Sequence, residues 1–470
     1  MYRPAATPDT HSAKQPFPAG FRWGVATAAY QIEGAVEEGG REPSIWDTYS
    51  KIPGNILNGD TGDIACDHYH RFEEDIDLMA SIGVTDYRLS ISWSRLLTGG
   101  ILNPEGVGFY RSLLTRLLGV GITPWVTLYH WDLPQWLEDA GGWPARETAQ
   151  QFADYAVAAH SALGDLAHHW ITVNEPVNTS LLGYAGGIHA PGRKSPRAGL
   201  AAAHHLHLGH GLATRAIQER DPTALIGPTF LLTPIHPATS DVTDLAAAVK
   251  LDGILNRLFL DPVFRGAYPD DLLENVERYG FSEVIRDGDL DIIAAPVDFL
   301  GVNYYFRVVV SAEPQGSGSS FDWRRDAWIG CEDVYPVEVD GVRTEMGWEI
   351  YPDGLTEVLT RVSREYSKVP IYITESGAAF ADDLTSDAHV DDHNRVAYMR
   401  SHISSSKRAI ELGVDLRGYF AWSLIDNFEW TFGFTKRFGL VHVDFETQVR
   451  TPKQSAAWYR ELIVDNGISL

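Results

Sequence analysis

Two glutamates follow two buried-strand patterns and could form a pair of catalytic carboxyl groups. Glu175 follows a β-branched and aromatic run that stops at Pro176, where the proline forces the chain out of a strand. Glu375 ends a second such run, and the turn residue Gly377 comes two positions later. One carboxyl group of such a pair can donate a proton while the other stays charged. Taken singly, each glutamate could equally be an exposed loop residue.

Other polar and aromatic side chains follow further strand patterns. Arg88 lies inside a strand-like run, and a buried charge needs a partner, so we expect it to face a carboxylate. Alternatively, Arg88 could lie at the edge of a strand and point into solvent. Indole rings can stack on the C–H faces of sugars, whereas amides, imidazole and carboxylates bind hydroxyl groups. The candidates that carry such groups are Gln31, His130, Asn174, Asn303, Tyr305, Trp422, Glu429 and Trp430.

The elements that must position these residues alternate between strand and helix patterns. Helical patterns at 67–82, 109–118, 147–163 and 198–220 separate several of the eight candidate strands, which are residues 21–27, 87–93, 122–129, 170–174, 225–231, 297–302, 371–374 and 418–423. Because the candidate residues follow the strands, the sequence predicts an α/β fold with a single (β/α)8 TIM barrel.

The remaining segments set the expected domain boundaries. Residues 1–16 predict a disordered lead-in and residues 17–465 one barrel domain, since no shift in composition marks a second domain. Residues 311–344 are rich in Gly and Ser, acidic and without clean periodicity. We expect them to form a long loop over the active face of the barrel, where substrate contacts concentrate.

Composition excludes several classes of partner. A formal charge of −25 over 470 residues argues against nucleic acid or an anionic membrane, and favours a neutral or cationic substrate. Cys66 and Cys331 form neither a disulfide framework nor a metal-spaced pair, so a cytoplasmic setting is expected. No run suits a signal peptide or a membrane span. Four histidines in 198–220 have no Cys or carboxylate in register, which predicts a structural helix and no metal site.

Five motifs in order resemble those of glycoside hydrolase family 1, the β-glucosidase family. The resemblance extends from about residue 17 to residue 459, and the motifs are QIEG at 31–34, HWDLP at 130–134, TVNEP at 172–176, ITESG at 373–377 and WSLIDNFEW at 422–430. It implies a retaining two-step hydrolysis of β-glycosides without a cofactor, in which Glu375 is the nucleophile and Glu175 the acid and base. The expected partner is a small β-glucoside or an oligosaccharide.

The resemblance also implies roles for the other candidates. Arg88 and Tyr305 would support the ionised form of Glu375, and Asn174 would hold the sugar 2-hydroxyl. Trp348 would be a platform for the aglycone, the part of the glycoside that leaves, although a core position is the alternative. The expected contacts of the sugar are Gln31, His130, Asn303, Trp422, Glu429 and Trp430.

One position narrows the expected substrate within the family, and another departs from the family's pattern. Glu429 stands where 6-phospho-β-glycosidases place a Ser, and a buried acid would repel phosphate, so a terminal β-glucosyl residue is expected, with β-fucosyl and β-galactosyl residues left open. Ser376 replaces the Asn that usually follows the nucleophile, which could alter rate or sugar preference. The alternatives are a 6-phospho-β-glycosidase and a catalytically silent sugar-binding barrel.

Overall fold

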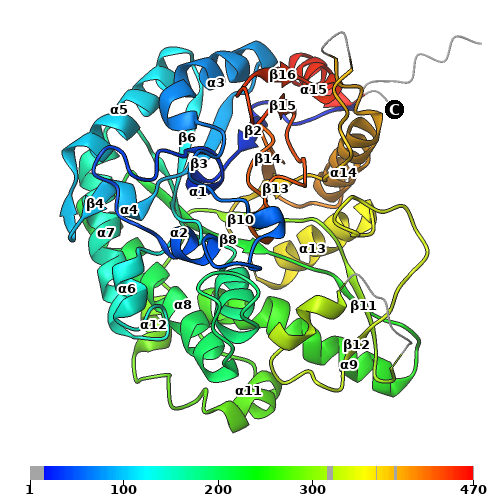
Figure 1. Ribbon diagram of the computed structural model, residues 1–470. Coiled ribbons are helices and arrows are strands. Elements are labelled where there is room, and N and C mark those ends of the chain that lie inside the picture. Colours follow the sequence, from blue (N-terminus) through cyan, green and yellow to red (C-terminus); the bar gives the residue numbers. More distant parts are fainter. Residues whose placement is uncertain (1–14, 315–320, 367, 386–388, 469–470) are drawn as a thin grey trace, which may run out of the picture.

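The centre of the molecule is a closed barrel of eight parallel strands (Figure 1). The computed structural model describes residues 15–314, 321–366, 368–385 and 389–468. The barrel strands in chain order are β2 (Arg22–Ala26), β3 (Asp86–Ser90), β6 (Thr123–Tyr129), β7 (His169–Asn174), β8 (Leu225–Leu231), β10 (Leu300–Asn303), β13 (Ile371–Ser376) and β14 (Leu416–Trp422). Each strand pairs with the next, and β14 pairs with β2 to close the barrel. This confirms the predicted (β/α)8 fold.

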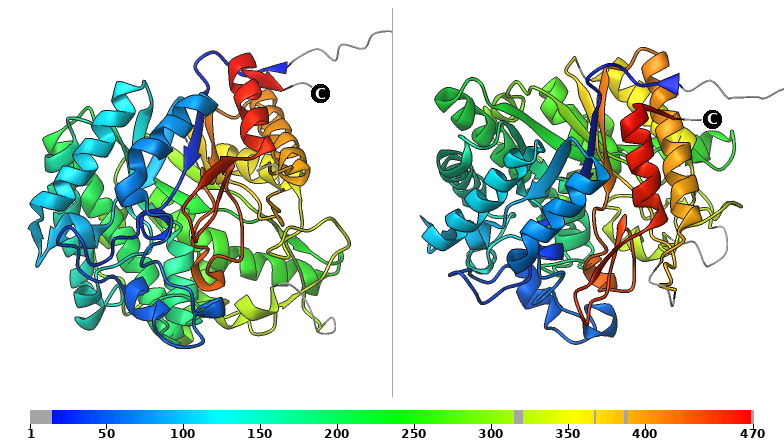
Figure 2. Two further views of the ribbon diagram at one scale, coloured as in Figure 1. Left: turned by 45° about the horizontal axis from the view of Figure 1, so that its top comes forward. Right: turned by 90° about the horizontal axis from the view of Figure 1, so that it is seen from above.

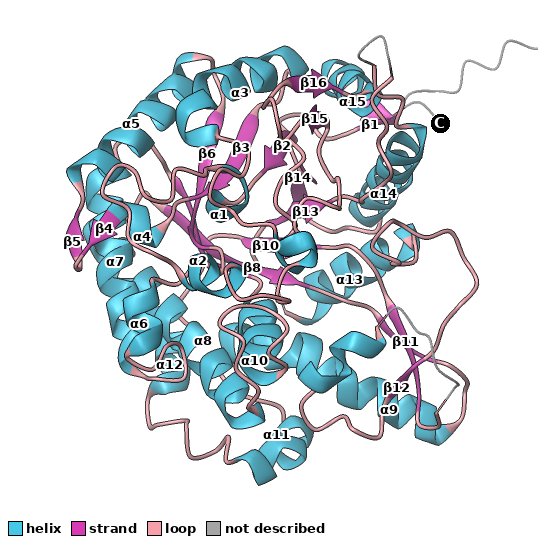
Figure 3. Cartoon of the chain, in the orientation of Figure 1, coloured by secondary structure: helices cyan, strands magenta, loops and turns pink. Residues whose placement is uncertain are grey.

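Helices form a ring around the strands (Figure 3). The longer ones are α3 (His68–Ile82), α5 (Pro104–Gly119), α7 (Glu147–Leu163), α8 (Pro196–Arg220), α13 (Pro352–Glu365), α14 (His393–Glu411) and α15 (Gln454–Asp465). Between β8 and β10 the chain forms α9 (Val242–Asp252), η3 (Gly253–Arg257), α10 (Leu258–Arg265), α11 (Asp270–Val276), η4 (Glu277–Tyr279) and α12 (Asp289–Ile293). Such connecting segments are the usual source of active-site residues in this architecture.

Short elements lie in the connections between barrel strands and ring helices. The short helices are α1 (Ala29–Ile32), α2 (Ile45–Ser50), η1 (Leu57–Gly59), α4 (Trp93–Leu96), α6 (Gln135–Asp139), the π-helical segment η2 (Asn178–Ala185) and η6 (Trp430–Phe432). Two small antiparallel pairs consist of β4 (Leu97–Thr98) with β5 (Ile101–Leu102), and β15 (Val441–Val443) with β16 (Arg450–Pro452).

Most predicted strands begin or end at different residues in the structure, and three of these differences affect the ends of strands β3, β10 and β13. The strand predicted at 87–93 stops at Ser90, because Trp93 begins helix α4. The strand predicted at 297–302 begins only at Leu300 and includes Asn303. Strand β13 likewise runs on through Glu375 to Ser376, so that the carboxyl group projects from the strand itself.

Aromatic side chains fill the barrel between its strands. The ring of Trp125 is fully buried and stacks on His169, with 4.0 Å between ring centroids. Its faces and edges also meet Phe299, Tyr372 and Phe420 in T-shaped contacts. Because the interior is packed in this way, as is usual for an eight-stranded barrel, a substrate has to bind at one end of the strands.

The segment 311–344, predicted as one long irregular loop, contains ordered elements. It begins at the end of β11 (Val308–Ser311), which pairs with β9 (Ile235–Pro237) and β12 (Tyr335–Pro336) in a small sheet outside the barrel (Figure 3). A 3-10 helix, η5 (Asp322–Ala327), lies between β11 and β12. Through η5, this segment contributes Arg324 to a cavity at the carboxyl ends of the barrel strands.

The two ends of the described chain lie side by side (Figure 2). Strand β1 (Gln15–Pro16) pairs with β17 (Gly467–Ile468), so the last two residues of the predicted lead-in 1–16 belong to a sheet. Residues 1–14 lie outside the described residues. The predicted barrel domain 17–465 ends with helix α15, and β17 adds a short extension to it.

Three of the four histidines of α8 have hydrogen-bond partners, whereas His207 has only ring contacts, with Phe230 and Phe259, among the described residues. His204 contacts Asp289 of α12 at 2.9 Å, a carboxylate that its helical spacing did not reveal. His205 contacts the backbone oxygen of Trp143, and His210 contacts Thr172. In the part of the chain that the structure describes, no group of three or more His, Cys, Asp or Glu could hold a metal ion. Within the same residues, no helix is long and apolar enough to cross a membrane.

Candidate active site

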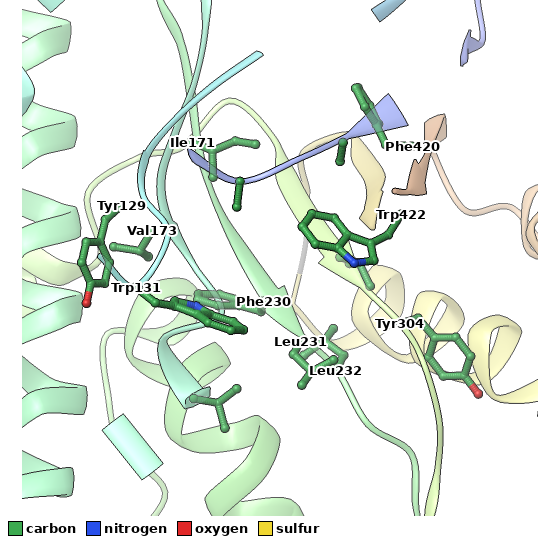
Figure 4. Packing of buried hydrophobic residues seen from close by; sticks show 14 of the residues in the cluster. Tyr129, Trp131, Ile171, Val173, Phe230, Leu231, Leu232, Tyr304, Phe420 and Trp422 are labelled. Atoms are coloured by element: carbon green, nitrogen blue, oxygen red, sulfur yellow. The ribbon is translucent and has the colours of Figure 1, made fainter. Parts of the chain in front are cut away.

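A cavity opens at the carboxyl ends of the barrel strands and brings together residues that are far apart in the sequence. It contains about 570 Å³ of space between atoms, open solvent at its mouth included. Trp131, Leu231 and Trp422 follow or end three different barrel strands and are seen at this end of the barrel in Figure 4. The predicted site residues that line the cavity are His130, Glu175, Tyr305, Trp348, Glu375, Trp422, Glu429 and Trp430.

The carboxyl group of Glu375 has a charged partner and a neutral donor. Oε1 forms an ion pair with Nη1 of Arg88, and Oε2 accepts a hydrogen bond from the hydroxyl of Tyr305 at 2.6 Å. All three side chains are at least nine-tenths buried. A positive charge and a hydrogen-bond donor both favour the ionised form of a carboxyl group. The arrangement therefore suits a group that reacts as a carboxylate.

Arg88 connects this carboxylate to a chain of polar groups. Its Nη2 donates to Oδ1 of Asn174 at 2.6 Å, and its Nε donates to Thr127 at 3.2 Å. The amide nitrogen of Asn174 lies 3.1 Å from Nε2 of His130. Burial and the charge of Arg88 hold the pKa of His130 well below its usual value, so the imidazole is neutral at neutral pH. It can then donate or accept a hydrogen bond to a hydroxyl group.

Glu175 occupies a different environment from that of Glu375. Its oxygens accept hydrogen bonds from Nδ2 of Asn303 at 2.6 Å and from Nδ2 of Asn178 at 2.5 Å. Burial, followed by repulsion from Glu375, raises the pKa of Glu175 well above its usual range. The backbone at Glu175 is left-handed, with φ of 44°, a conformation that non-glycine residues adopt at a cost. The carboxyl group of Glu175 is therefore protonated at neutral pH and is held by two amide donors.

Aromatic rings and a third carboxyl group surround the pair. The indoles of Trp422 and Trp430 lie nearly parallel to the imidazole of His130, at 19° and 18°. Glu429 reaches the same cavity, and burial together with the charge of Glu375 raises the pKa of its side chain to about 8. Trp348 packs on Tyr305 with 5.6 Å between ring centroids. Apolar ring faces beside hydrogen-bonding groups are the features that sugars require.

Four predicted site residues lie behind the cavity wall: Gln31, Arg88, Asn174 and Asn303. Arg88 was predicted to face a carboxylate and forms an ion pair with Glu375, whereas its support of a nucleophile stays a prediction. The amide nitrogen of Gln31 donates to the backbone oxygen of Phe428 at 2.8 Å and to Asn427 at 3.0 Å. Asn303 donates to Glu175 and Asn174. Direct contact of Gln31, Asn174 and Asn303 with a sugar stays a prediction.

The structure adds cavity residues that the sequence did not single out: Trp131, Asn178, His189 and Arg324. Trp131 lies within the HWDLP motif and donates from Nε1 to the backbone oxygen of Asn174 at 3.0 Å. Asn178 follows Glu175 by three residues, a spacing that places both on one side of a helical turn. Arg324 comes from η5, within the residues 311–344 that were predicted to cover the active face, but nothing in the sequence singled out this residue.

Ser376, which replaces the residue expected after the nucleophile, is completely buried. Its hydroxyl has no hydrogen-bond partner among the described residues. The hydroxyl of Tyr419 donates to the backbone oxygen of Ser376 at 3.4 Å. The neighbouring Glu375 contacts Arg88 and Tyr305 in the presence of this serine.

Comparison with known proteins gives matches over almost the whole chain. The model of the family described as glycosyl hydrolase family 1 matches residues 13–468. Beta-glucosidase A of Acetivibrio thermocellus is 43% identical over 97% of this chain and 100% of its own length. A bifunctional beta-D-glucosidase/beta-D-fucosidase of Bifidobacterium breve is 46% identical over 96% of this chain and 98% of its own.

Solved structures similar to this chain are also beta-glucosidases. The crystal structure of the psychrophilic beta-glucosidase BglU from Micrococcus antarcticus superposes with a TM-score of 0.93 and 48% identity, covering 97% of this chain and 98% of that one. A beta-glucosidase from Thermotoga maritima in complex with deoxynojirimycin gives a TM-score of 0.90 at 42% identity, with coverage of 96% and 99%.

Proposed function

The chain belongs to glycosyl hydrolase family 1, and from that membership we propose that it is a retaining β-glucosidase. It would remove terminal non-reducing β-D-glucosyl residues from glycosides and oligosaccharides by double displacement. The names of the relatives support glucose as the sugar, and the bifunctional relative supports β-fucosyl residues as a second substrate. An enzyme of this family that releases glucose from short β-glucans would take part in cellobiose degradation.

The contrast between the environments of the two glutamates is the observation that carries the proposal. Glu375 faces the guanidinium of Arg88 and the hydroxyl of Tyr305, which favour a carboxylate. Glu175 receives only amide donors and has a raised pKa. A carboxylate paired with a cation suits the nucleophile, and a neighbouring carboxyl group with a raised pKa suits the acid.

In the first step, the carboxylate of Glu375 attacks the anomeric carbon and forms an ester bond to it. The bond between that carbon and the glycosidic oxygen breaks, and Glu175 transfers its proton to this oxygen, so that the aglycone leaves as an alcohol. Asn178 and Asn303 hold the carboxyl group of Glu175 in place for this transfer. The two-step route replaces one difficult displacement with two easier ones.

In the second step, Glu175 acts as a base. Once Glu375 is esterified it carries no charge, so the repulsion that raised the pKa of Glu175 is removed and its carboxylate form becomes easier to hold. Glu175 takes a proton from water, the water oxygen attacks the anomeric carbon, and the ester bond breaks. Glu375 leaves as a carboxylate, and the sugar is released with its original β configuration.

Binding of the sugar would use the remaining residues of the cavity. Trp422 and Trp430 present ring faces, while His130 and Glu429 present hydrogen-bonding groups. The carboxyl group of Glu429 can hydrogen-bond a hydroxyl but supplies no positive charge for a phosphate, which supports an unphosphorylated sugar. Gln31, Asn174 and Asn303 are proposed to contribute from behind the wall, and Trp348 to face the aglycone.

The buried free thiols of Cys66 and Cys331 support a reducing, cytoplasmic location for the enzyme.

Hydrolysis of four nitrophenyl glycosides tests the proposed function. The purified protein is given the β-glucoside, β-fucoside, β-galactoside and 6-phospho-β-glucoside without added metal. We expect fast release from the β-glucoside and little from the phosphorylated substrate. Release from the 6-phospho-β-glucoside alone would replace the proposal with the phosphoglycosidase, and no release from any of the four by folded protein would indicate a silent barrel.

A further inference from the structure

A second cavity adjoins the candidate active site. It contains about 430 Å³ of space between atoms, open solvent included. Asn178, Leu231, Phe306 and Arg324 line both cavities, so the second begins where the first ends. A ligand that extends outward from Glu175 past these residues would enter it. Because the glycosidic oxygen must lie beside Glu175, that ligand is the aglycone.

The walls of this second cavity are almost entirely hydrocarbon. Apart from Asn178, Thr233 and Arg324, its described lining consists of aliphatic and aromatic side chains and one alanine. Val177, Leu181 and Val308 are all less than one-tenth exposed and form part of the wall. The amide nitrogen of Asn178 already donates to Glu175. Few hydrogen-bonding groups are therefore left for an occupant.

Arg324 stands at the junction of the two cavities. Its guanidinium carbon lies 5.2 Å from the ring centroid of Phe306 and 5.7 Å from that of Trp348, both of which line the candidate active site. The guanidinium therefore lies beside rings of the candidate active site. Hydroxyl groups farther along the aglycone would face the mostly apolar lining of the second cavity.

We infer that the aglycone site is built for an alkyl or aryl group, and that such glucosides are better substrates than those with a second sugar as the leaving group. This inference rests on the proposed β-glucosidase activity and specifies its substrate class. A sugar in the second cavity would lose water from several hydroxyl groups without replacement hydrogen bonds, which is unfavourable. An alkyl chain or aromatic ring loses only water that covers apolar surface, which is favourable.

A series of alkyl β-glucosides with methyl, butyl, hexyl and octyl aglycones tests the inference, with cellobiose as the disaccharide. Each buried methylene group should raise kcat/KM by roughly threefold until the cavity is filled. The substrates are kept below their micelle-forming concentrations. Equal kcat/KM along the series, or a higher value for cellobiose than for hexyl glucoside, would overturn the inference. Failure to cleave any of these glucosides would instead overturn the proposed function.

Two leucine variants test whether the preference for long alkyl groups arises in the second cavity. Leu255 of η3 lines the second cavity and is half-buried, whereas Leu245 of α9 is 47% exposed and does not line it. Leu255→Asn should lower the ratio of the octyl to the methyl rate constants, and Leu245→Asn should leave this ratio unchanged. If the octyl-to-methyl ratio is the same in both variants and the wild type, the aglycone does not bind in the second cavity, and the inference is overturned. If Leu255→Asn does not fold, Leu255→Ala replaces it in the test, and we expect a smaller decrease in the octyl-to-methyl ratio.

Discussion

Arg88 and Glu375 form a buried ion pair across the barrel, although 287 residues separate them in the sequence. Arg88 comes from β3 and Glu375 from β13, and the same guanidinium also binds the amide oxygen of Asn174 at 2.6 Å. A planar guanidinium can hold two acceptors in fixed directions, which a lysine ammonium cannot do with the same geometry. The orientation of the proposed nucleophile thus depends on a residue that does not line the cavity.

Arg88→Lys should lower kcat for nitrophenyl β-glucoside by on the order of 100-fold, because the charge is retained but the two contacts are not held together. The matched control is Arg111→Lys, which changes an exposed pair with Asp165 and should leave kcat within error. The assay combines initial rates with thermal unfolding, so that loss of fold is separated from loss of rate. A fully active Arg88→Lys enzyme would show that the shape of the guanidinium is unimportant.

Glu375→Ala should reduce turnover by about 10⁴-fold or more, because no covalent intermediate can form. Azide is small enough to occupy the vacated space and should restore release of an activated aglycone, giving an α-glycosyl azide. The product configuration is read by NMR. A variant that keeps ordinary activity, or a β-configured azide product, would contradict the assignment of the nucleophile.

Glu175→Ala should affect substrates according to their leaving groups. Dinitrophenolate leaves without a proton, so the first step on dinitrophenyl glucoside should be nearly retained, while alkyl glucosides should lose about 10²- to 10⁴-fold. Burst kinetics on the activated substrate would show an intermediate that accumulates because its hydrolysis lacks the base. Equal losses on both classes of substrate would argue against the acid role.

Arg324→Ala should move the alkaline limb of the pH profile of kcat/KM to higher pH. The charge of Arg324 lowers the pKa of Glu175, so its removal raises that pKa, and the acid then stays protonated at higher pH. The control is Arg325→Ala, which removes the neighbouring cation outside this cavity. A shift of the limb to lower pH, or the same shift in both variants, would contradict the effect of the charge on Glu175.

Asp132→Asn should make stability less dependent on pH. Asp132 is fully buried, and desolvation raises the pKa of its carboxyl group to about 8. A group with a raised pKa in the folded state contributes stability at low pH and loses it as the pH rises towards 8. The amide has no such titration, so thermal unfolding of the variant should change less between pH 5 and pH 8. If the unfolding temperatures of variant and wild type change in parallel between pH 5 and pH 8, Asp132 does not titrate in this range, which would contradict the prediction.

Much of this architecture could be predicted from local sequence pattern. Each barrel strand is a short apolar run followed by polar residues. The pattern of apolar residues and the flanking turn residues are enough to identify such a strand. The pairing of Arg88 with a carboxylate was also predictable, since a charge inside an apolar strand has few alternatives. The strand ends were harder to predict: Trp93 fits a strand by type but begins helix α4, because tertiary contacts override local preference.

The residues that escaped prediction belong to segments whose position depends on long-range contacts. Arg324 follows a Gly- and Ser-rich stretch, and its entry into the cavity depends on η5 lying beside Phe306 and Trp348. The contact of Asn303 with Glu175 joins strands β10 and β7 across β8, so it follows from barrel closure rather than from spacing. Local periodicity contains no information about either contact.

The pairing of β1 with β17 has a practical consequence for handling the enzyme. Gln15 and Ile468 are register partners, and Trp23 at the start of β2 donates to Asn466 at 3.0 Å, so both ends of the described chain sit at the amino ends of the barrel strands. The substrate cavity lies at the carboxyl ends, on the opposite pole. Immobilisation on a resin at the β1–β17 pole would therefore leave the entrance for glycosides facing the solution.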